Sequence, residues 1–182
     1  MPSRPAMCDP MLRLAILRHA EAVPQGDLAD RERPLTEAGR DMAERMGQFF
    51  RAEKLEPDLA LVSPSVRTRE TFEGFLRGAK QKLAAEFPPA LYHASLDGLE
   101  QIVAEAPRSV KFLLIVGHNP GFAELAVALA GKGKKSELAK MRAHFPTPSL
   151  ALIDFETDRW TTILHGDGRL EYFVSRGALA KL

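Results

Sequence analysis

The chain has 182 residues, of which 45% are hydrophobic and 27% are charged, and its 25 Lys and Arg nearly balance its 24 Asp and Glu. This composition is typical of a water-soluble globular protein, and the balanced charge argues against nucleic acid or a membrane surface as a partner. No run approaches the roughly 20 apolar residues of a membrane helix, the N-terminus lacks a secretory signal, and the single cysteine, Cys8, excludes an internal disulfide. We therefore expect a cytoplasmic protein.

One domain is expected to follow a short leader. Residues 1–11 contain three prolines and predict a flexible leader. Residues 12–182 are enough for a single domain with a sizeable core.

From residue 12 onward, short apolar runs alternate with amphipathic stretches. The apolar runs predict strands at residues 12–17, 58–64, 89–93, 111–120, 149–155, 159–164 and 169–174. The sequence "GDG" at 166–168 predicts a hairpin turn between the last two strands. The amphipathic stretches predict helices after Thr36 and Ser65, which both suit an N-cap, and over 95–107 and 120–131, with Gly131 ending the last.

This order of elements predicts a three-layer α/β/α sandwich with a mainly parallel sheet. In such sheets ligands bind beyond the carboxyl ends of the strands. Polar side chains follow three of the predicted strands, namely Arg18-His19, Arg67 and His118-Asn119. We therefore expect residues nearly a hundred positions apart to meet at one edge of the sheet.

Two arginines and two histidines at that edge predict a pocket for a phosphoryl group. A guanidinium can bind two phosphate oxygens at once, and a neutral imidazole is a nucleophile at physiological pH. Each feature alone also has a structural explanation, because Arg18-His19 can bond to loop carbonyls and Arg67 can be solvated. A cation in the first turn of a helix opposes the helix dipole, however, and a bound anion would reverse that penalty.

Three segments resemble the signature motifs of the histidine phosphatase superfamily, the phosphoglycerate mutase-like group. They are "LRHAEA", "SPSVRTRET" and "VGHNPG", and the similarity extends from about Leu12 onward. The short chain, "RPLTEAGR" and "VGHNPGF" look most like the SixA-type phosphohistidine phosphatases. The resemblance implies a phosphoglycerate mutase-like fold.

By matched position, the resemblance implies a role for each residue of the pocket. His19 would be the nucleophile and become transiently phosphorylated, while Arg18 and Arg67 would grip the phosphoryl oxygens beside a second histidine, His118. Arg33, in "RPLT", is expected to join the phosphate-binding set. The scheme needs no metal ion or cofactor, and the sequence shows no convincing cluster of metal ligands.

The sequence departs from the family pattern in two places. Ala20 stands where the motif usually has glycine, which is tolerable if the backbone there has a negative φ. No residue matches the glutamate that serves many members as general acid. Glu21, Asp97 and Glu100 are the candidates, although a structural role is favoured for Asp97 and Glu100 and equally expected for Glu21.

The missing acid bears on the substrate. An aliphatic alkoxide leaves poorly without a proton donor, whereas the imidazole of phosphohistidine leaves neutral when its other nitrogen already carries a proton. The sequence therefore predicts a phosphatase acting on phosphohistidine in another protein.

Other functions stay open at this point. A small-molecule phosphomonoesterase of the same superfamily is one, and a non-catalytic phosphate-binding or protein-interaction module is another. The expected partner is a phosphorylated protein or a small phosphorylated substrate, not nucleic acid or a membrane, and a monomer is compatible with the sequence. His93, His144 and His165 show no companions and are expected to be structural.

Overall fold

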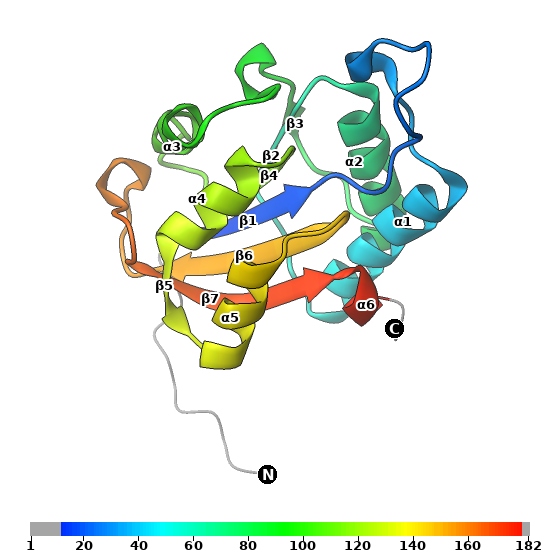
Figure 1. The fold of residues 1–182 in the computed structure, drawn as a ribbon. Coiled ribbons are helices and arrows are strands. Elements are labelled where there is room, and N and C mark those ends of the chain that lie inside the picture. Colours follow the sequence, from blue (N-terminus) through cyan, green and yellow to red (C-terminus); the bar gives the residue numbers. More distant parts are fainter. Residues whose placement is uncertain (1–11, 180–182) are drawn as a thin grey trace.

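A seven-stranded sheet organises residues 12–179, the part of the chain that the computed structural model describes (Figure 1). The predicted leader, residues 1–11, lies outside the described residues. The strand order is β3-β2-β4-β1-β6-β7-β5. The strands are β1 (Leu12–Arg18), β2 (Leu59–Val62), β3 (Ala85–Glu86), β4 (Phe112–Gly117), β5 (Ala130–Gly133), β6 (Ser149–Phe155) and β7 (Gly168–Ser175).

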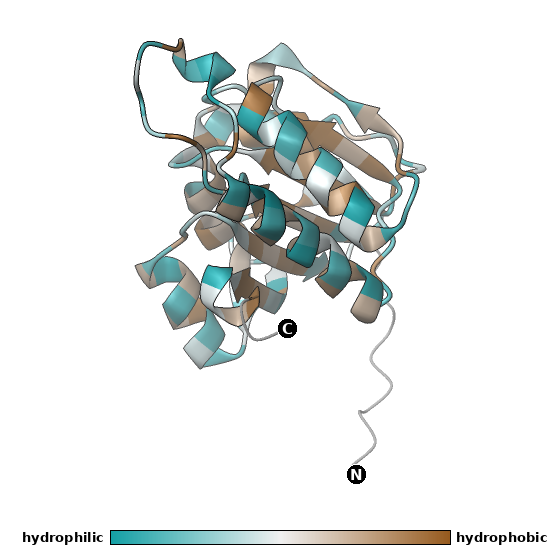
Figure 2. Ribbon diagram, turned by 90° about the vertical axis from the view of Figure 1, so that its right-hand side faces the viewer, coloured by the Kyte–Doolittle hydropathy of each residue, from teal (hydrophilic) through white to brown (hydrophobic). Residues whose placement is uncertain are grey.

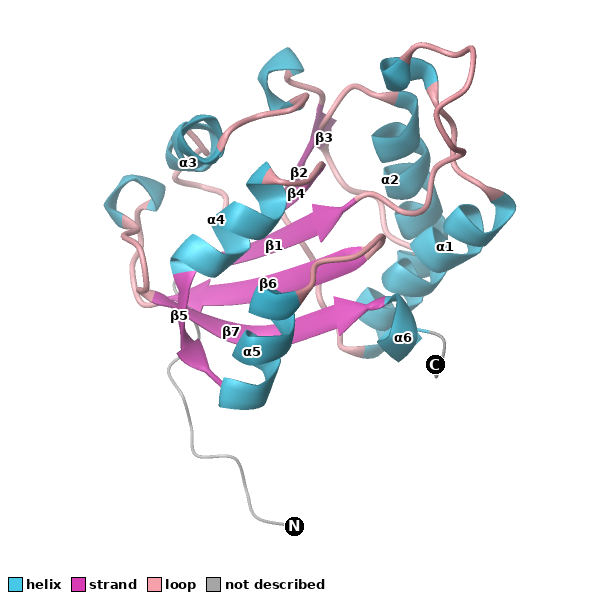
Figure 3. Ribbon diagram, in the orientation of Figure 1, coloured by secondary structure: helices cyan, strands magenta, loops and turns pink. Residues whose placement is uncertain are grey.

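The sheet is mainly parallel, as predicted. Four strand pairs are parallel, β1–β4, β2–β4, β2–β3 and β5–β7, and only β6 runs antiparallel to its two neighbours. In register, Arg18 pairs with Gly117 and Val62 with Val116, so β1, β4 and β2 end side by side. The loops after these strands therefore leave from the same edge of the sheet (Figure 3).

Helices cover both faces of the sheet and complete the predicted three layers. One face carries α1 (Glu37–Ala52), α2 (Val66–Ala79) and α6 (Arg176–Leu179), and the other carries α3 (Leu96–Ala104), α4 (Gly121–Leu129) and α5 (Lys135–Ala143). Alternate residues of β1 point to opposite faces, with Leu14 and Ile16 in the α3–α4 core and Ala15 and Leu17 in the α1–α2 core. Figure 2 shows the hydrophobic strands between helices whose outer surfaces are largely hydrophilic.

Side-chain caps begin the helices as the sequence indicates. The Thr36 hydroxyl accepts a hydrogen bond from the Gly39 N–H at the start of α1, and Ser65 accepts from the Thr68 N–H at the start of α2. Ser95 caps α3 in the same way. The cap at Ser65 places Arg67 in the first turn of α2, directly beyond the end of β2.

Two predicted strands are wrong. Residues 89–93 begin with the 3-10 turn η2 (Pro89–Leu91), and the third strand is instead the short β3, because Pro88 and Pro89 offer no N–H to a sheet. Residues 159–164 contain the 3-10 turn η3 (Trp160–Thr162), since β6 pairs directly with β7 and leaves no place between them. Trp160 is buried, and its indole donates to the Val110 carbonyl oxygen at 2.9 Å.

Two predicted glycine turns also differ from the structure. Helix α4 ends at Leu129, and Gly131 lies in β5, where a Cβ would overlap the backbone of Gly166. The "GDG" turn, with φ of +77° at Gly166, connects η3 to β7 rather than two strands. In residues 12–179, no helix is long and apolar enough to cross a membrane.

Substituting Gly47 tests the packing that holds α2 in place. A Cβ at Gly47 of α1 would overlap the Phe75 carbonyl of α2, and one at Gly78 of α2 would overlap the Glu44 carbonyl of α1, so the two backbones touch. We expect Gly47→Ala to lower the free energy of unfolding by about 1–3 kcal/mol or more in urea denaturation, because the helices must move apart. Gly177→Ala in α6 is the control, since its Cβ would meet no atom within 4 Å. Equal stability of the two variants would contradict this packing.

Candidate functional site

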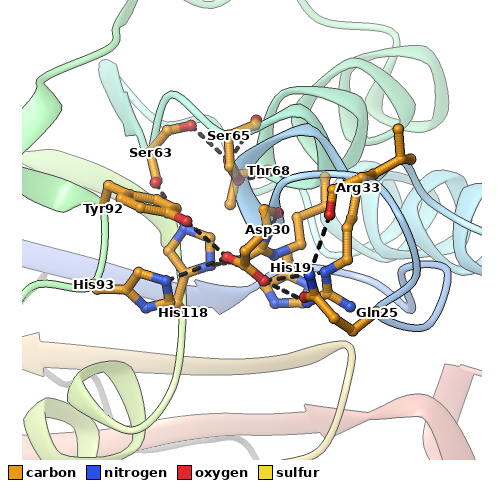
Figure 4. A network of polar contacts seen from close by, with 12 residues as sticks. His19, Gln25, Asp30, Arg33, Ser63, Ser65, Thr68, Tyr92, His93 and His118 are labelled. Atoms are coloured by element: carbon orange, nitrogen blue, oxygen red, sulfur yellow. Dashed lines mark hydrogen bonds and ion pairs between the residues drawn. The ribbon is translucent and has the colours of Figure 1, made fainter.

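The ends of β1, β2 and β4 deliver His19, Ser63 and His118 to one pocket (Figure 4). The backbone N–H of His19 donates to the Gly117 carbonyl at 3.0 Å, and that of Ser63 donates to the Val116 carbonyl at 2.9 Å. The ring centroids of His19 and His118 are 5.3 Å apart. The sheet thus extends its hydrogen bonding to the residues of the pocket and holds their backbones in place.

His19 is held in one tautomer by its own neighbour. The residue is 8% exposed, and its Nδ1 atom lies 2.7 Å from the carbonyl oxygen of Ala20. A carbonyl can only accept, so Nδ1 carries the proton and Nε2 keeps a free lone pair. Burial, together with the charges of Arg67, Arg18 and Arg33, lowers the pKa of His19 to about 4. His19 is therefore neutral at physiological pH, with Nε2 available to attack.

Ala20 fits the first motif without backbone strain. Among the described residues other than glycine, positive φ is confined to Lys54, Lys80 and His93. The Ala20 side chain is fully buried, and its N–H donates to the Thr71 hydroxyl at 3.0 Å. The methyl group that replaces the usual hydrogen is therefore accommodated.

His118 is also neutral, with its proton on the other nitrogen. The Arg67 guanidinium can only donate, so the 3.3 Å contact of its Nη2 makes Nδ1 of His118 the acceptor. Nε2 then donates to the Ser63 hydroxyl at 2.7 Å. Burial first, and then the neighbouring His19 and Arg67, lower the pKa of His118 to about 3.

The pocket contains two guanidinium N–H groups that need an anion. The Nε atoms of Arg18 and Arg67 are buried and have no hydrogen-bond partner among residues 12–179. Arg18 uses Nη1 to donate to the Phe145 carbonyl at 2.6 Å, and no carboxylate in the described chain pairs with it. Since a buried cationic donor without a partner is costly, an anion at this place would be stabilised.

Asp30 is the acidic centre of the site, and the sequence did not indicate it. Its Oδ2 atom accepts hydrogen bonds from Arg67 Nη2 at 2.9 Å and Tyr92 Oη at 2.7 Å, and lies 3.3 Å from His93 Nε2. Arg33 donates from Nε to Oδ1 at 3.1 Å. The bonds from Tyr92 and Arg67 hold the pKa of Asp30 well below its usual range, so this carboxylate stays ionised.

From the sequence, His93 was expected to have no partners at the site, and the structure corrects this expectation. Its ring centroid lies 5.3 Å from that of His118 and 4.3 Å from that of Tyr92, beside Asp30. His165 also has a partner, Glu100. No pattern in the sequence marks these contacts, since His93 lies in a loop 63 positions from Asp30.

The structure brings together four of the predicted residues and separates the three candidate acids from them. His19, His118, Arg18 and Arg67 share the pocket, and Arg33 reaches it through Asp30 while bonding to the Val23 carbonyl. The carboxylates lie elsewhere: Glu21 pairs with Arg176 of α6, Glu100 with His165 beside η3, and Asp97 is exposed in the first turn of α3. No hydrogen bond or ion pair within residues 12–179 joins these three to either histidine.

A hollow of about 410 Å³ lies beside Arg18, between α4 and α5. Asn119, Val127, Met141 and Phe145 are among the residues that line it. A substrate larger than a phosphate group therefore has room beside Arg18.

Two comparisons of the sequence with known proteins found relatives. Residues 14–92 match the family described as the histidine phosphatase superfamily (branch 1). A Mycobacterium tuberculosis protein is 30% identical over 139 residues, which are 75% of this chain and 85% of that protein.

Solved structures with the same fold include three that carry the name SixA. SixA of Nakamurella multipartitia has a TM-score of 0.79 at 23% identity, over 92% of this chain and 98% of that one. SixA of Agrobacterium tumefaciens has a TM-score of 0.76 at 27% identity, over 90% of this chain and 97% of that one. The structure of the protein histidine phosphatase SixA complexed with tungstate has a TM-score of 0.69 at 23% identity, over 90% of this chain and 97% of that one. These similarities confirm the predicted phosphoglycerate mutase-like fold.

NMR titration of the imidazole rings tests the electrostatics of the pocket. Because the pKa of His19 lies near 4 and that of His118 near 3, we expect both rings to keep their neutral signals as the pH falls from about 7 to about 5. Between the pKa of about 4 and the ordinary 6.5 of His19, the unfolded chain binds more protons, so stability should fall as the pH is lowered through this window. A midpoint near 6.5 for either ring would contradict the pocket described above.

Proposed function

We propose that this chain, a member of the histidine phosphatase superfamily, is a SixA-type phosphatase that acts through a phosphohistidine on His19 without a metal ion. Its substrate in this proposal is phosphohistidine in another protein. The observation that carries this proposal is the tautomer of His19. Its Nδ1–H is held by the Ala20 carbonyl, so Nε2 keeps a free lone pair. The charges of Arg67 and Arg18 act on this ring, and each of these arginines has a buried Nε–H without a partner among residues 12–179.

In the first step, the Nε2 lone pair of His19 forms a bond to phosphorus while the bond to the leaving group breaks. The electron pair of the broken bond stays on the leaving group. Arg18 and Arg67 would bind the phosphoryl oxygens, whose charge is the main thing that such a site must stabilise. His19 keeps its Nδ1 proton throughout, so the phosphorylated ring is cationic and reactive.

In the second step, water attacks phosphorus and the bond to His19 Nε2 breaks. The products are dihydrogen phosphate and neutral His19, so the step balances without removing a proton from the protein. Dividing the hydrolysis into two displacements lowers the barrier of each.

The nature of the leaving group favours phosphohistidine as the substrate. A protonated phosphoimidazole transfers its phosphoryl group to His19 and leaves as neutral imidazole, which exchanges one N–P bond for another of the same kind. The alcohol part of a phosphate ester leaves as an alkoxide unless an acid supplies a proton. Asp30, the carboxylate at this pocket, is ionised by its partners, and the other candidate acids lie elsewhere.

Transfer of radioactive phosphate tests this function. With a ³²P-phosphohistidine protein as donor, we expect the wild-type enzyme to release phosphate and to carry acid-labile label transiently, with EDTA having no effect. His19→Ala should lose both label and turnover, a fall of at least about 10³-fold, because the nucleophile is absent. His165→Ala, an exposed ring outside the pocket, is the matched control.

Other results would redirect the function. Label on His19 from small phosphate esters alone would keep the mechanism and make the protein a phosphomonoesterase. No label and no turnover with any donor would make the site a phosphate-binding module.

A further inference from the structure

The Asp30 carboxylate lies against a group of three flat rings, and the mechanism above gives these groups no role. The ring centroids of Tyr92, His93 and His118 are 4.3 to 5.5 Å from one another. Tyr92 and His93 both direct a polar atom to Oδ2 of Asp30, at 2.7 and 3.3 Å (Figure 4). An ionised acceptor beside aromatic faces, next to the phosphoryl pocket, suits a flat ring that carries an N–H group.

His93 shows that an imidazole can occupy such a place. Its side chain is 54% exposed, yet its Nε2 atom lies 3.3 Å from Asp30 Oδ2. Since a carboxylate only accepts, the His93 nitrogen is the donor. The backbone of His93 has φ of +53°, a region that side-chain-bearing residues seldom adopt unless their surroundings hold them there. Because His93 is exposed, a second imidazole can share or replace its contact without disturbing the core.

We propose that Asp30, Tyr92 and His93 form the subsite for the leaving imidazole of the substrate. Asp30 accepts the N–H of the ring nitrogen that does not carry phosphorus. This inference rests on the proposed function and specifies how the same site selects its substrate.

The bond from the substrate ring to Asp30 has a direct chemical consequence. As the N–P bond breaks, its electron pair stays on the departing nitrogen and the phosphoryl group passes to Nε2 of His19. The opposite nitrogen keeps its proton, so the ring leaves as neutral imidazole. Asp30 stabilises that protonated form before departure, as the aspartate of a Ser-His-Asp triad stabilises its imidazolium, and it stays ionised throughout.

Asp30 also holds Arg67, and the test must separate the two roles. Arg67 donates to both the side chain and the backbone carbonyl of Asp30. Loss of that anchor would weaken phosphoryl binding for every donor alike. Loss of a leaving-group contact would weaken turnover only for donors whose leaving ring carries an N–H.

The experiment compares phosphoimidazole with p-nitrophenyl phosphate in wild type and Asp30→Asn. Both donors have a flat leaving ring, but only phosphoimidazole offers a ring N–H. We expect Asp30→Asn to reduce kcat/KM for phosphoimidazole by about 10- to 100-fold more than for p-nitrophenyl phosphate, which corresponds to one charge-assisted hydrogen bond. Asp30→Glu, which keeps the charge, should restore part of this preference.

Asp41→Asn is the matched control, because Asp41 is an exposed carboxylate that also pairs with an arginine, Arg45 of α1. It should leave both activities unchanged. Should Asp30→Asn fail to fold, NMR of the wild-type enzyme with imidazole and inorganic phosphate gives an independent reading. The signals of Asp30, Tyr92 and His93 are expected to shift, and their constancy at saturating imidazole would overturn the subsite.

The outcomes distinguish the subsite from the function on which it rests. If Asp30→Asn slows both donors by the same factor, Asp30 acts only through Arg67 and the subsite is wrong, while the phosphatase function stands. If the wild-type enzyme hydrolyses p-nitrophenyl phosphate but leaves phosphoimidazole and phosphohistidine intact, the proposed substrate class falls and the subsite falls with it.

Discussion

The side chain of Arg67 is 2% exposed, and the residue lies in the first turn of α2, where a cation opposes the helix dipole. Asp30 compensates this charge with its carboxylate and its backbone carbonyl. The chain between β1 and α1 therefore has to fold over the pocket to bring Asp30 into place. Tyr92 and His93 reach the same carboxylate from the loop before α3. One buried cation thus joins three segments that are distant in the sequence.

The same burial decides the chemistry of the two histidines. Desolvation and the nearby arginines disfavour imidazolium, so His19 and His118 stay neutral. Neutrality alone would leave the tautomer open. For His19 the adjacent Ala20 carbonyl selects it, and for His118 Arg67 and Ser63 select it. A cationic pocket with a neutral imidazole is the combination that nucleophilic attack on a phosphoryl group requires.

Features with a local cause could be predicted from the sequence. The buried strands that end in Arg18-His19 and His118, and the caps at Thr36 and Ser65, depend on residues close together in the chain. The prediction of a strand at 159–164 was wrong because strand formation depends on neighbours in the sheet. Strands β6 and β7 pair directly with each other and leave no edge between them for another strand. Asp30 was missed for a similar reason. In the sequence it is one charge among several in a polar loop. Only its tertiary contacts with residues 37 to 63 positions away give it a central place in the hydrogen-bond network of the site.

The way in which the carboxylates are paired bears on what the pocket can cleave. Glu21 is paired with Arg176 and Glu100 with His165, and neither bonds to the two histidines. Asp30, the carboxylate at the pocket, is kept ionised by Tyr92 and Arg67. In the proposed mechanism the proton therefore comes with the substrate. An imidazole that carries its own N–H meets this condition, and an ionised acceptor such as Asp30 favours that protonated ring over the unprotonated one. The ion pair that keeps Arg67 stable inside the protein would by the same charge favour a leaving group that brings its own proton.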